Sequence, residues 1–319
     1  MKRRIARLVL IAALLTLCAC GSGDEVRSLI LSTGDETGTY YRFGNLLARR
    51  VSATTDTFVA AVASEGSKDN ILALGRNEAQ LAFTQYDVML HARNGTNAFQ
   101  VNGPNRSFSV VAALYPEAVH IVTLDPEIRS VEDLAGKRVS IGTAGSGAAF
   151  NAVDILKAYG LTEKDIQTYH QSFSDSVDAL LGGWLDAAFI VAGAPVSTIT
   201  ALREERPVYL ISLDETHIAA LTGGESAYRP AVIGADVYAT PEDCATVAVD
   251  AVIVADNRVS SDEVYDFVRG IYDNTEPLER ESAFAEYLSP ELAASVTEIP
   301  YHPGAARSWA ERGISVPAA

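Results

Sequence analysis

Short apolar runs alternate along this sequence with segments in which apolar residues recur at helical spacing. The first such pair is a run over 28–33, followed by a segment in which Phe43, Leu46, Leu47 and Val51 fall on one face of a helix. Alternation of this kind is typical of βα units, in which helices cover the sheet that the strands form. The sequence therefore predicts an α/β fold.

The alternation continues towards the C-terminus. Further strands are expected over 58–64, 81–85, 108–115, 119–124, 138–142, 165–170, 186–192 and 246–255. Helices are expected over 68–74, 131–134, 147–159, 174–181 and 262–272. One more is expected to begin at Pro195, because a proline in a first helical turn has no N–H to lose.

The pattern restarts after Tyr115-Pro116-Glu117, which we interpret as a domain boundary. The chain has 319 residues, more than one hydrophobic core usually organises. Apolar residues make up about half of it, and no low-complexity tract interrupts it, so disorder is not expected. We therefore expect two lobes.

The N-terminus has the features of an export signal. Its cationic residues are Lys2, Arg3, Arg4 and Arg7. The apolar run over 8–17 that follows them is shorter than the roughly 20 residues that cross a bilayer. Residues 1–19 are therefore predicted to be a cleaved signal peptide, with a retained signal anchor as the alternative. The mature chain is expected in the periplasm, outside the inner membrane.

The cysteines suggest how the N-terminus is processed. Leu17-Cys18-Ala19-Cys20 resembles a bacterial lipobox and predicts a lipid on Cys20. The alternative is ordinary cleavage nearby, which leaves a plain thiol. Cys244 then stands alone far down the chain, where it is expected to be buried filler rather than a nucleophile.

Charge excludes several classes of partner. Without residues 1–19 the chain holds 21 lysines and arginines against 41 acidic residues, a net charge of about −20. Nucleic acid and anionic membrane surfaces are poor partners for such a chain. Contact with a membrane is expected only through the lipid on Cys20.

Two turns between a strand and a helix are rich in glycine and hydroxyl residues. They span 33–41 and 142–148, one in each expected lobe. Glycine lets the backbone approach a ligand closely, and the free N–H groups and dipole of a helix start favour negative charge. The alternative is that the glycines only make tight turns and that Thr37 or Ser146 only caps a helix. Two such turns facing each other predict a shared anion site.

Enzymatic motifs are incomplete. Gly142 and Gly147 have the spacing of a phosphate-binding loop, but Ala148 and Ala149 stand where the lysine and hydroxyl residue belong. Ser146 lies between glycines, as in a nucleophile elbow, yet the outer positions differ. The histidines are scattered at positions 91, 120, 170, 217 and 302, none in a metal-ligand spacing. We expect no enzyme, metal or cofactor, and keep a serine hydrolase as a minor alternative.

Short motifs in order along the chain carry a resemblance to a known family. They are Thr37-Gly38-Thr39-Tyr40-Tyr41, Glu65-Gly66-Ser67 with Asn70, Gln85-Tyr86-Asp87, Leu114-Tyr115-Pro116-Glu117 with His120, Leu134-Ala135-Gly136-Lys137-Arg138-Val139, Gly145-Ser146-Gly147 with Asn151, and Ala187-Ala188-Phe189 leading to Ala192-Gly193-Ala194-Pro195. In their order and spacing, the chain resembles the TAXI family, the binding subunits of tripartite ATP-independent periplasmic (TRAP) transporters.

The resemblance implies a fold and a function. The fold is the type II periplasmic-binding-protein fold, with residues 20–118 and 245–319 in lobe I and 119–244 in lobe II, joined by a hinge around a ligand cleft. The function is that of a monomeric receptor that delivers a small organic anion, of the glutamate, 2-oxoacid or dicarboxylate class, to a TRAP membrane permease. A ligand-sensing module that partners a sensor kinase remains an alternative.

The resemblance also implies ligand-binding residues: Thr37, Gly38, Thr39, Tyr40, Ser67, Gln85, Tyr115, Thr143, Gly145, Ser146, Gly147 and Asn151. Tyr40 rather than Tyr41 is expected to face the cleft, because adjacent residues point to different sides of a helix. Ala148 and Arg42 depart from the family pattern. Arg42 is either solvated or paired with a ligand carboxylate. Asp87 is expected to cap the helix after Gln85.

Overall fold

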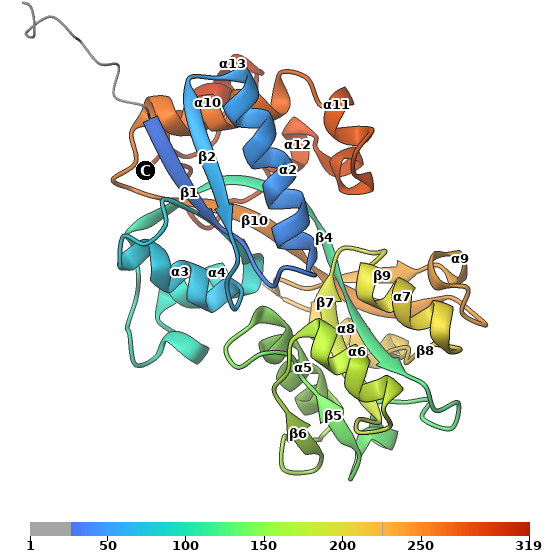
Figure 1. Cartoon of the computed structure of the whole chain (residues 1–319). Coiled ribbons are helices and arrows are strands. Elements are labelled where there is room, and N and C mark those ends of the chain that lie inside the picture. The colour runs from blue at the N-terminus through green and yellow to red at the C-terminus, as the bar shows by residue number, and fades with distance from the viewer. Residues whose placement is uncertain (1–26, 225) are drawn as a thin grey trace, which may run out of the picture.

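The computed structural model describes residues 27–224 and 226–319 (Figure 1). The predicted signal peptide, residues 1–19, and the predicted lipidation site, Cys20, lie outside these ranges. Within them, no helix combines the length and the apolar character needed to cross a membrane.

Within the described ranges, ten strands form one mixed sheet. They are β1 (Arg27–Ser32), β2 (Thr57–Val62), β3 (Leu81–Gln85), β4 (Phe108–Thr123), β5 (Arg138–Ser140), β6 (Gln167–Tyr169), β7 (Ala187–Ala192), β8 (Tyr209–Leu210), β9 (Arg229–Ile233) and β10 (Cys244–Asp256). Their order is β2-β1-β3-β10-β4-β7-β5-β6, with β8 beside β4 and β9 beside β10. The pairs β1–β2, β1–β3, β5–β6 and β5–β7 are parallel, and the pairs made by β4 and β10 are antiparallel.

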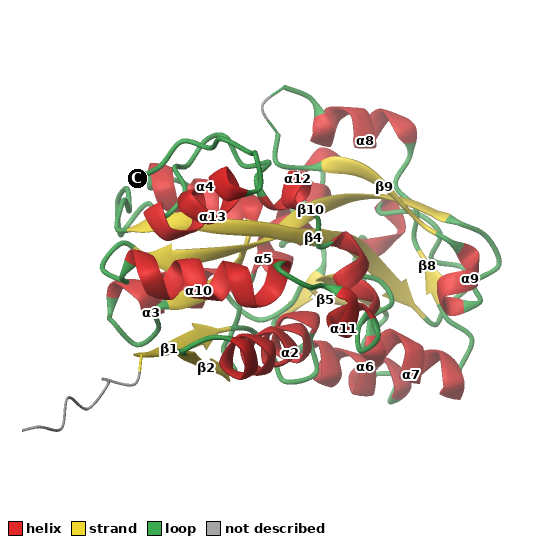
Figure 2. Ribbon diagram, turned by 90° about the horizontal axis from the view of Figure 1, so that it is seen from above, coloured by secondary structure: helices red, strands yellow, loops and turns green. Residues whose placement is uncertain are grey.

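Helices cover both faces of this sheet (Figure 2). They are α2 (Thr39–Thr54), α3 (Ser67–Gly75), α4 (Tyr86–Asn94), α5 (Gly147–Ala158), α6 (Phe173–Leu181), α7 (Ser197–Glu205), α8 (Glu215–Thr222), α9 (Ala235–Tyr238), α10 (Ser261–Tyr272), α11 (Glu276–Glu279), α12 (Pro290–Ala293) and α13 (Pro303–Glu311). Short 3₁₀ turns lie at Asn97–Phe99, Glu132–Leu134 and Ala283–Tyr287.

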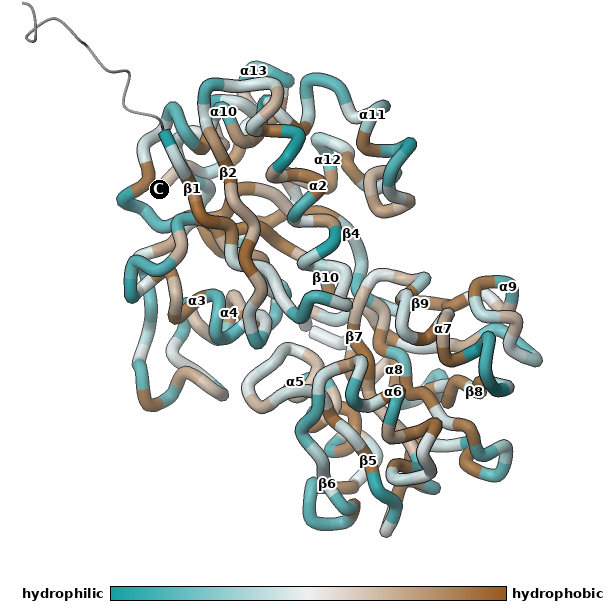
Figure 3. Tube along the Cα trace, viewed as in Figure 1, coloured by the Kyte–Doolittle hydropathy of each residue, from teal (hydrophilic) through white to brown (hydrophobic). Residues whose placement is uncertain are grey.

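Buried apolar side chains form separate cores in two parts of the molecule, which we call lobe I and lobe II. The lobe I core draws on residues 29–115 and 251–309, and it contains Trp309. Lobe II, within 118–249, has one core on each face of its sheet. Val119 and Ile121 point into one and Ala118 and Val122 into the other, as alternate strand residues do. Hydrophobic segments lie inside both lobes in the tube view (Figure 3).

Two strands, β4 and β10, run through both lobes. The two strands expected over 108–115 and 119–124 are one strand, because β4 continues through Pro116, which lies opposite Asp250 of β10. The register shifts next to this point, so that Tyr115 pairs with Ala251 and Ala113 with Val252 while Leu114 is left over. A proline is tolerated in a strand at such an irregularity. The change of lobe therefore happens inside two paired strands and not in a loop.

The helix expected to begin at Pro195 begins at Ser197 instead. Val196 is its N-cap, in extended conformation, and donates its N–H to the Tyr238 hydroxyl at 2.7 Å. Pro195 lies in the preceding turn, and its peptide bond to Ala194 is cis. The sequence pattern also missed the short strands β8 and β9 and the helices α8 and α9, which belong to lobe II.

Candidate functional site

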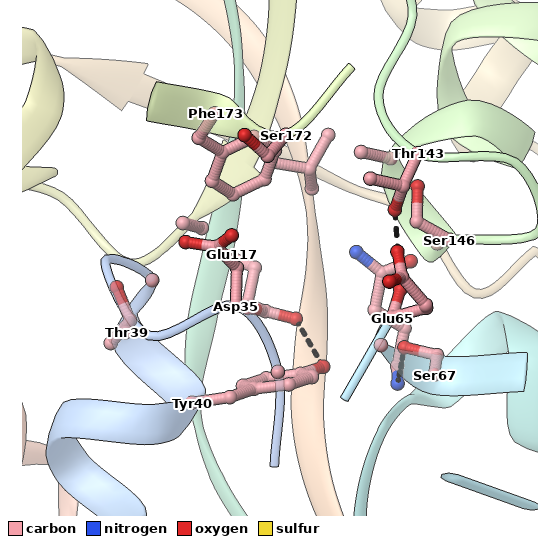
Figure 4. Close-up of a pocket in the computed structure, with 18 of the residues that line it drawn as sticks. Asp35, Thr39, Tyr40, Glu65, Ser67, Glu117, Thr143, Ser146, Ser172 and Phe173 are labelled. Atoms are coloured by element: carbon pink, nitrogen blue, oxygen red, sulfur yellow. Dashed lines mark hydrogen bonds between the residues drawn. The ribbon is translucent and has the colours of Figure 1, made fainter. Parts of the chain in front are cut away.

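A cleft between the two lobes encloses about 550 Å³, part of it open to solvent (Figure 4). Its lining comes from Gly34, Asp35, Gly38, Thr39, Tyr40, Glu65, Gly66, Ser67, Gln85 and Glu117 on the lobe I side and hinge, and from Thr143, Ser146, Gly147, Ala148, Gln171, Ser172, Phe173, Val191 and Ala192 of lobe II. Most of these residues stand at the ends of strands or the starts of helices. The cleft is thus bounded by loops that the sheet holds in place.

Four helices of at least nine residues begin at this cleft. They are α2, α3, α5 and α6, and their N-caps are Gly38, Gly66, Ser146 and Ser172. Ser146 accepts from the Ala149 N–H and Ser172 from the Asp175 N–H, at 3.2 and 3.1 Å. Each helix start has N–H groups without a partner in its own helix and the positive end of the helix dipole. Their convergence favours a negatively charged group in the cleft.

Glycine is required at specific points in this lining and in the turn before α5. Gly66 has φ 105° and Gly142 has φ 91°, both in the region that favours glycine. Glycine is required at position 147 because a side chain does not fit there: an added Cβ would lie 1.9 Å from Gln85 Oε1. The Gln85 side chain of lobe I therefore packs directly against the start of α5 in lobe II.

Glu117 is the most unusual residue of the cleft. It lies on β4 between the lobes, only 2% exposed, and its Oε2 accepts a hydrogen bond from the Tyr40 hydroxyl at 2.7 Å. Burial raises the pKa of Glu117 to about 8, the nearby Asp87 and Asp250 add to the rise, and Tyr40 and Gln85 oppose it. Burial therefore favours the protonated form of this carboxyl at neutral pH.

The charged side chains of the lining are all acidic. Asp35, Glu65 and Glu117 face the cleft, and no lysine or arginine is among the residues that line it in the described part of the chain. Asp35 already accepts from the Thr37 N–H at 2.8 Å, and Glu65 is exposed at the surface. A negatively charged ligand group could therefore be bound only by the N–H groups of the helix starts, because no side-chain cation lines the described cleft.

Hydrogen bonds join the lobes across the cleft. Asn151 of α5 donates to Asp87 of α4 at 2.8 Å and to the Tyr228 hydroxyl at 2.7 Å. Thr143 donates to the Glu65 carbonyl at 3.2 Å. Asp87 is 5% exposed, and burial raises its pKa to about 7. These contacts define a closed arrangement of the two lobes.

The structure brings most of the expected binding residues to the cleft. Those in its lining are Gly38, Thr39, Tyr40, Ser67, Gln85, Thr143, Ser146 and Gly147. Four lie outside it. Thr37 faces away and accepts a bond from Ser197 at its carbonyl, and Gly145 makes the tight turn before α5 with φ 83°. Tyr115 is fully buried against Phe43 and Phe284, and the buried Asn151 makes the interlobe bonds described above.

Sequence reasoning missed several lining residues. Glu117 was noted only as part of a motif, and Asp35 only as part of a loop. Ser172 and Phe173 could have been found, because a serine followed three residues later by Asp175 is a helix-start signal. Gln171, Val191 and Ala192 carry no pattern that marks them as cleft residues.

Other expectations can be placed as well. Asp87 is inside α4, whose N-cap is Gln85, so the expected capping role is wrong. Arg42 lines a separate surface groove with Arg49 and Ser197, not the cleft. Cys244 is buried, as expected. In 27–224 and 226–319, no group of three His, Cys, Asp or Glu residues could hold a metal ion.

Comparisons with known proteins agree with this architecture. Similar solved structures include the alkanesulfonate-binding protein SsuA from Xanthomonas axonopodis pv. citri bound to MOPS, at 18% identity and TM-score 0.52, covering 89% of this chain and 83% of that one. A second is an ancestral arginine-binding protein bound to arginine, at 13% identity and TM-score 0.51, covering 83% of this chain and 100% of that one. A third is a periplasmic transporter, at 14% identity and TM-score 0.55, covering 83% of this chain and 88% of that one.

At these identities the likeness establishes the fold, which is the type II periplasmic-binding-protein fold, as expected. A family model described as the NMT1-like family matches residues 31–313. Because this match extends over most of the sequence, the chain belongs to the NMT1-like family.

Proposed function

We propose that the protein is an extracytoplasmic solute-binding receptor that closes its two lobes on a small organic ligand and delivers it to a membrane transporter. The observation that carries the proposal is the cleft itself, where four helix starts from both lobes converge. Concave sites between lobes with a few convergent polar groups are the usual form of small-molecule sites. The solute-binding neighbours of the same fold support this reading.

The proposed ligand carries a carboxylate. The N–H groups at the starts of α5 and α6 would receive it, at Gly147, Ala148 and Phe173, together with the start of α2. The Ser146 N–H is already bonded to the Thr143 carbonyl. Each such hydrogen bond to a charged group contributes roughly 1.5–3 kcal/mol net once water is excluded. The acidic lining disfavours the dicarboxylate end of the expected class, since a second carboxylate finds no side-chain cation in the cleft.

The finer assignment extends the resemblance to the TAXI family. The transporter is then a TRAP permease, the predicted division at 118/119 and 244/245 separates the two moving lobes, and a lipid on Cys20 keeps the receptor at the membrane. A deletion strain that loses uptake of the ligand, with uptake restored by the intact gene, supports this assignment. A strain that keeps uptake but loses a transcriptional response contradicts it and favours the sensor alternative.

The cleft offers little for hydrolysis. The Ser146 hydroxyl accepts from the Ala149 N–H as a helix cap, and no histidine is among the described residues that line the cleft. His170, the nearest in sequence to the lining segment 171–173, contacts the Gly142 carbonyl at 3.2 Å through Nδ1. A nucleophilic serine needs a base within hydrogen-bond reach.

The binding proposal is tested by a thermal-shift screen of amino acids, 2-oxoacids and other small carboxylates. A ligand at 100 times its dissociation constant adds about 2.7 kcal/mol of stability, which raises the melting temperature measurably. Calorimetry then gives the affinity of each stabilising compound. If only neutral sugars stabilise the protein, the carboxylate part of the proposal fails.

A further inference from the structure

We infer that the cleft contains a subsite for a positively charged nitrogen at Glu117 and Asp35, so that the ligand carries an ammonium group together with its carboxylate. The inference rests on the proposed function and narrows it to amino-acid-like zwitterions or related amines. Three features of the cleft support it: the geometry around Glu117, the charges of the lining, and the aromatic rings nearby.

Glu117 offers an acceptor to the cleft. Its Oε2 accepts from the Tyr40 hydroxyl at 2.7 Å, and the Gln85 side chain is a second, neutral neighbour of the carboxyl. The residue lines the cleft although it is 2% exposed, so a ligand that reaches it excludes water from the contact. A buried acceptor of this kind is stabilised most by a charged donor, because charge-assisted hydrogen bonds are about twice as strong as neutral ones.

The carboxyl groups that line the cleft have no lysine or arginine beside them in the lining, within the described residues. Asp35 lines the cleft with Glu117, and its Oδ1 is held by the Thr37 N–H, which leaves Oδ2 available. The buried carboxyl groups of Asp87 and Asp250 lie near enough to Glu117 to raise its pKa. An ammonium group beside Glu117 favours the ionised form of this carboxyl and so offsets the effect of burial, whereas a ligand anion favours the protonated form and gains no ion pair.

Aromatic rings lie beside the carboxyl. Tyr40 and Phe173 come from lobe I and lobe II, and Figure 4 shows Glu117 between them in this view. The Tyr40 ring is held against Phe83, with 4.8 Å between the ring centroids. Ring faces attract cations, and rings fixed by packing do so without further ordering. In the same view Ser146, at the start of α5, lies apart from Glu117, so this helix start and the acidic groups with their rings are available to the two charges of a zwitterion.

The experiment compares ligands that differ only at the nitrogen. The pairs are L-glutamate with 2-oxoglutarate, L-leucine with 4-methyl-2-oxopentanoate, and L-phenylalanine with phenylpyruvate, extended by the other common amino acids and by putrescine. Calorimetry on the wild-type chain is expected to show at least tenfold tighter binding of the amino compound in every pair that binds. This measurement needs no variant.

Glu117→Gln tests the residue itself, since it keeps the shape and the acceptor for Tyr40 but removes the charge. We expect the preference for the amino compound to fall by at least tenfold. The control is Glu127→Gln, an exposed position in lobe II, which should leave the preference unchanged.

The outcomes separate this inference from the proposed function. Equal or tighter binding of an oxo compound overturns the ammonium subsite and leaves the receptor proposal standing. The subsite is equally overturned if carboxylates bind and no compound with a positive nitrogen does. If no compound of either kind binds, both proposals fail.

Discussion

Gly147→Ala tests how tightly the two lobes fit against each other. The Cβ that alanine adds would lie 1.9 Å from Gln85 Oε1, 2.3 Å from its Cδ and 2.9 Å from its Nε2. Real Cβ atoms do not approach other atoms so closely, so the Gln85 amide must move or α5 must draw back. Gln85 is 3% exposed and lines the cleft, which means that the space open to it is the space of the ligand.

Both responses weaken binding. Overpacking of a well-packed contact costs roughly 1–3 kcal/mol, which corresponds to about 5-fold to 150-fold in the closing equilibrium. We therefore expect the affinity for the identified ligand to fall by about 5-fold to 150-fold, while the free energy of unfolding changes little, because the contact joins the lobes and does not belong to either core. Calorimetry measures the first quantity, and urea unfolding of the ligand-free protein measures the second.

Two further variants make the test specific. Gln85→Ala in the Gly147→Ala background removes the obstructing amide and should restore much of the affinity. Gly75→Ala is the matched control, since no atom lies within 4 Å of its added Cβ and affinity should not change. If Gly147→Ala binds as tightly as the parent protein, the close interlobe contact is not part of the ligand-bound state and the reasoning is refuted.

Three further predictions concern the polar groups behind the cleft. Asn151→Ala removes the interlobe bond to Asp87 and the bond to Tyr228 within lobe II, so we expect about 5-fold to 30-fold weaker ligand binding by calorimetry, with α5 intact by circular dichroism. Raising the pH from 5 to 8 should lower the melting temperature of the ligand-free protein, because the raised pKa values of Asp87 and Glu117 make the folded form favour the protonated carboxyl groups. The stability that these two groups contribute is complete below the ordinary carboxyl pKa. It is lost as the pH rises through about 7 and 8. Asp87→Asn should reduce this dependence by about 3 kcal/mol between pH 5 and 8, and an unchanged slope would contradict the assignment. Asn70→Ala should cost about 2–4 kcal/mol of unfolding free energy in urea, since the fully buried amide accepts from the Ser32 hydroxyl and donates to two strand carbonyls, and a loss below 1 kcal/mol would argue against these bonds.

Periodicity predicted the regular elements well. The strand over 81–85 matches β3, and the helix over 262–272 differs from α10 (Ser261–Tyr272) by one residue. These segments have a continuous apolar run or a clear helical stripe, which local physics is enough to interpret. The short strand β8 could not be predicted this way, because it has two residues and exists only through its pairing with β4.

The hinge strand shows where local reasoning fails. Pro116 is a good sign of a strand end in isolation, yet β10 on one side and the register shift beside it hold the strand together. Pairing between segments more than 100 residues apart decides this, and no window of sequence contains it. The same limit hid Glu117, because its importance comes from burial between lobes and not from its neighbours in the chain.

The candidate site could be predicted only in part, because only its local signals can be read from the sequence. Glycines and hydroxyls at helix starts are visible in the sequence, and Gly38, Thr39, Ser146 and Gly147 do line the cleft. Asn151 has the right chemistry but faces Asp87, since helical rotation and the approach of α4 place it behind the start of α5. The direction from which one helix packs against another depends on the tertiary fold, and the spacing of residues in the sequence does not reveal it.

Glu117 lies on β4, the strand that passes from one lobe to the other, and this position links ligand binding to movement of the lobes. It follows Pro116 directly on β4, at the point where the chain passes from one lobe to the other. Any rotation of the lobes must twist β4 and β10 near this residue and so turn its carboxyl relative to Tyr40. A ligand that binds the carboxyl is therefore held at the pivot of this rotation, where its hydrogen bond depends on the angle between the lobes, whereas contacts at the mouth of the cleft bridge the parts of the lobes that move farthest.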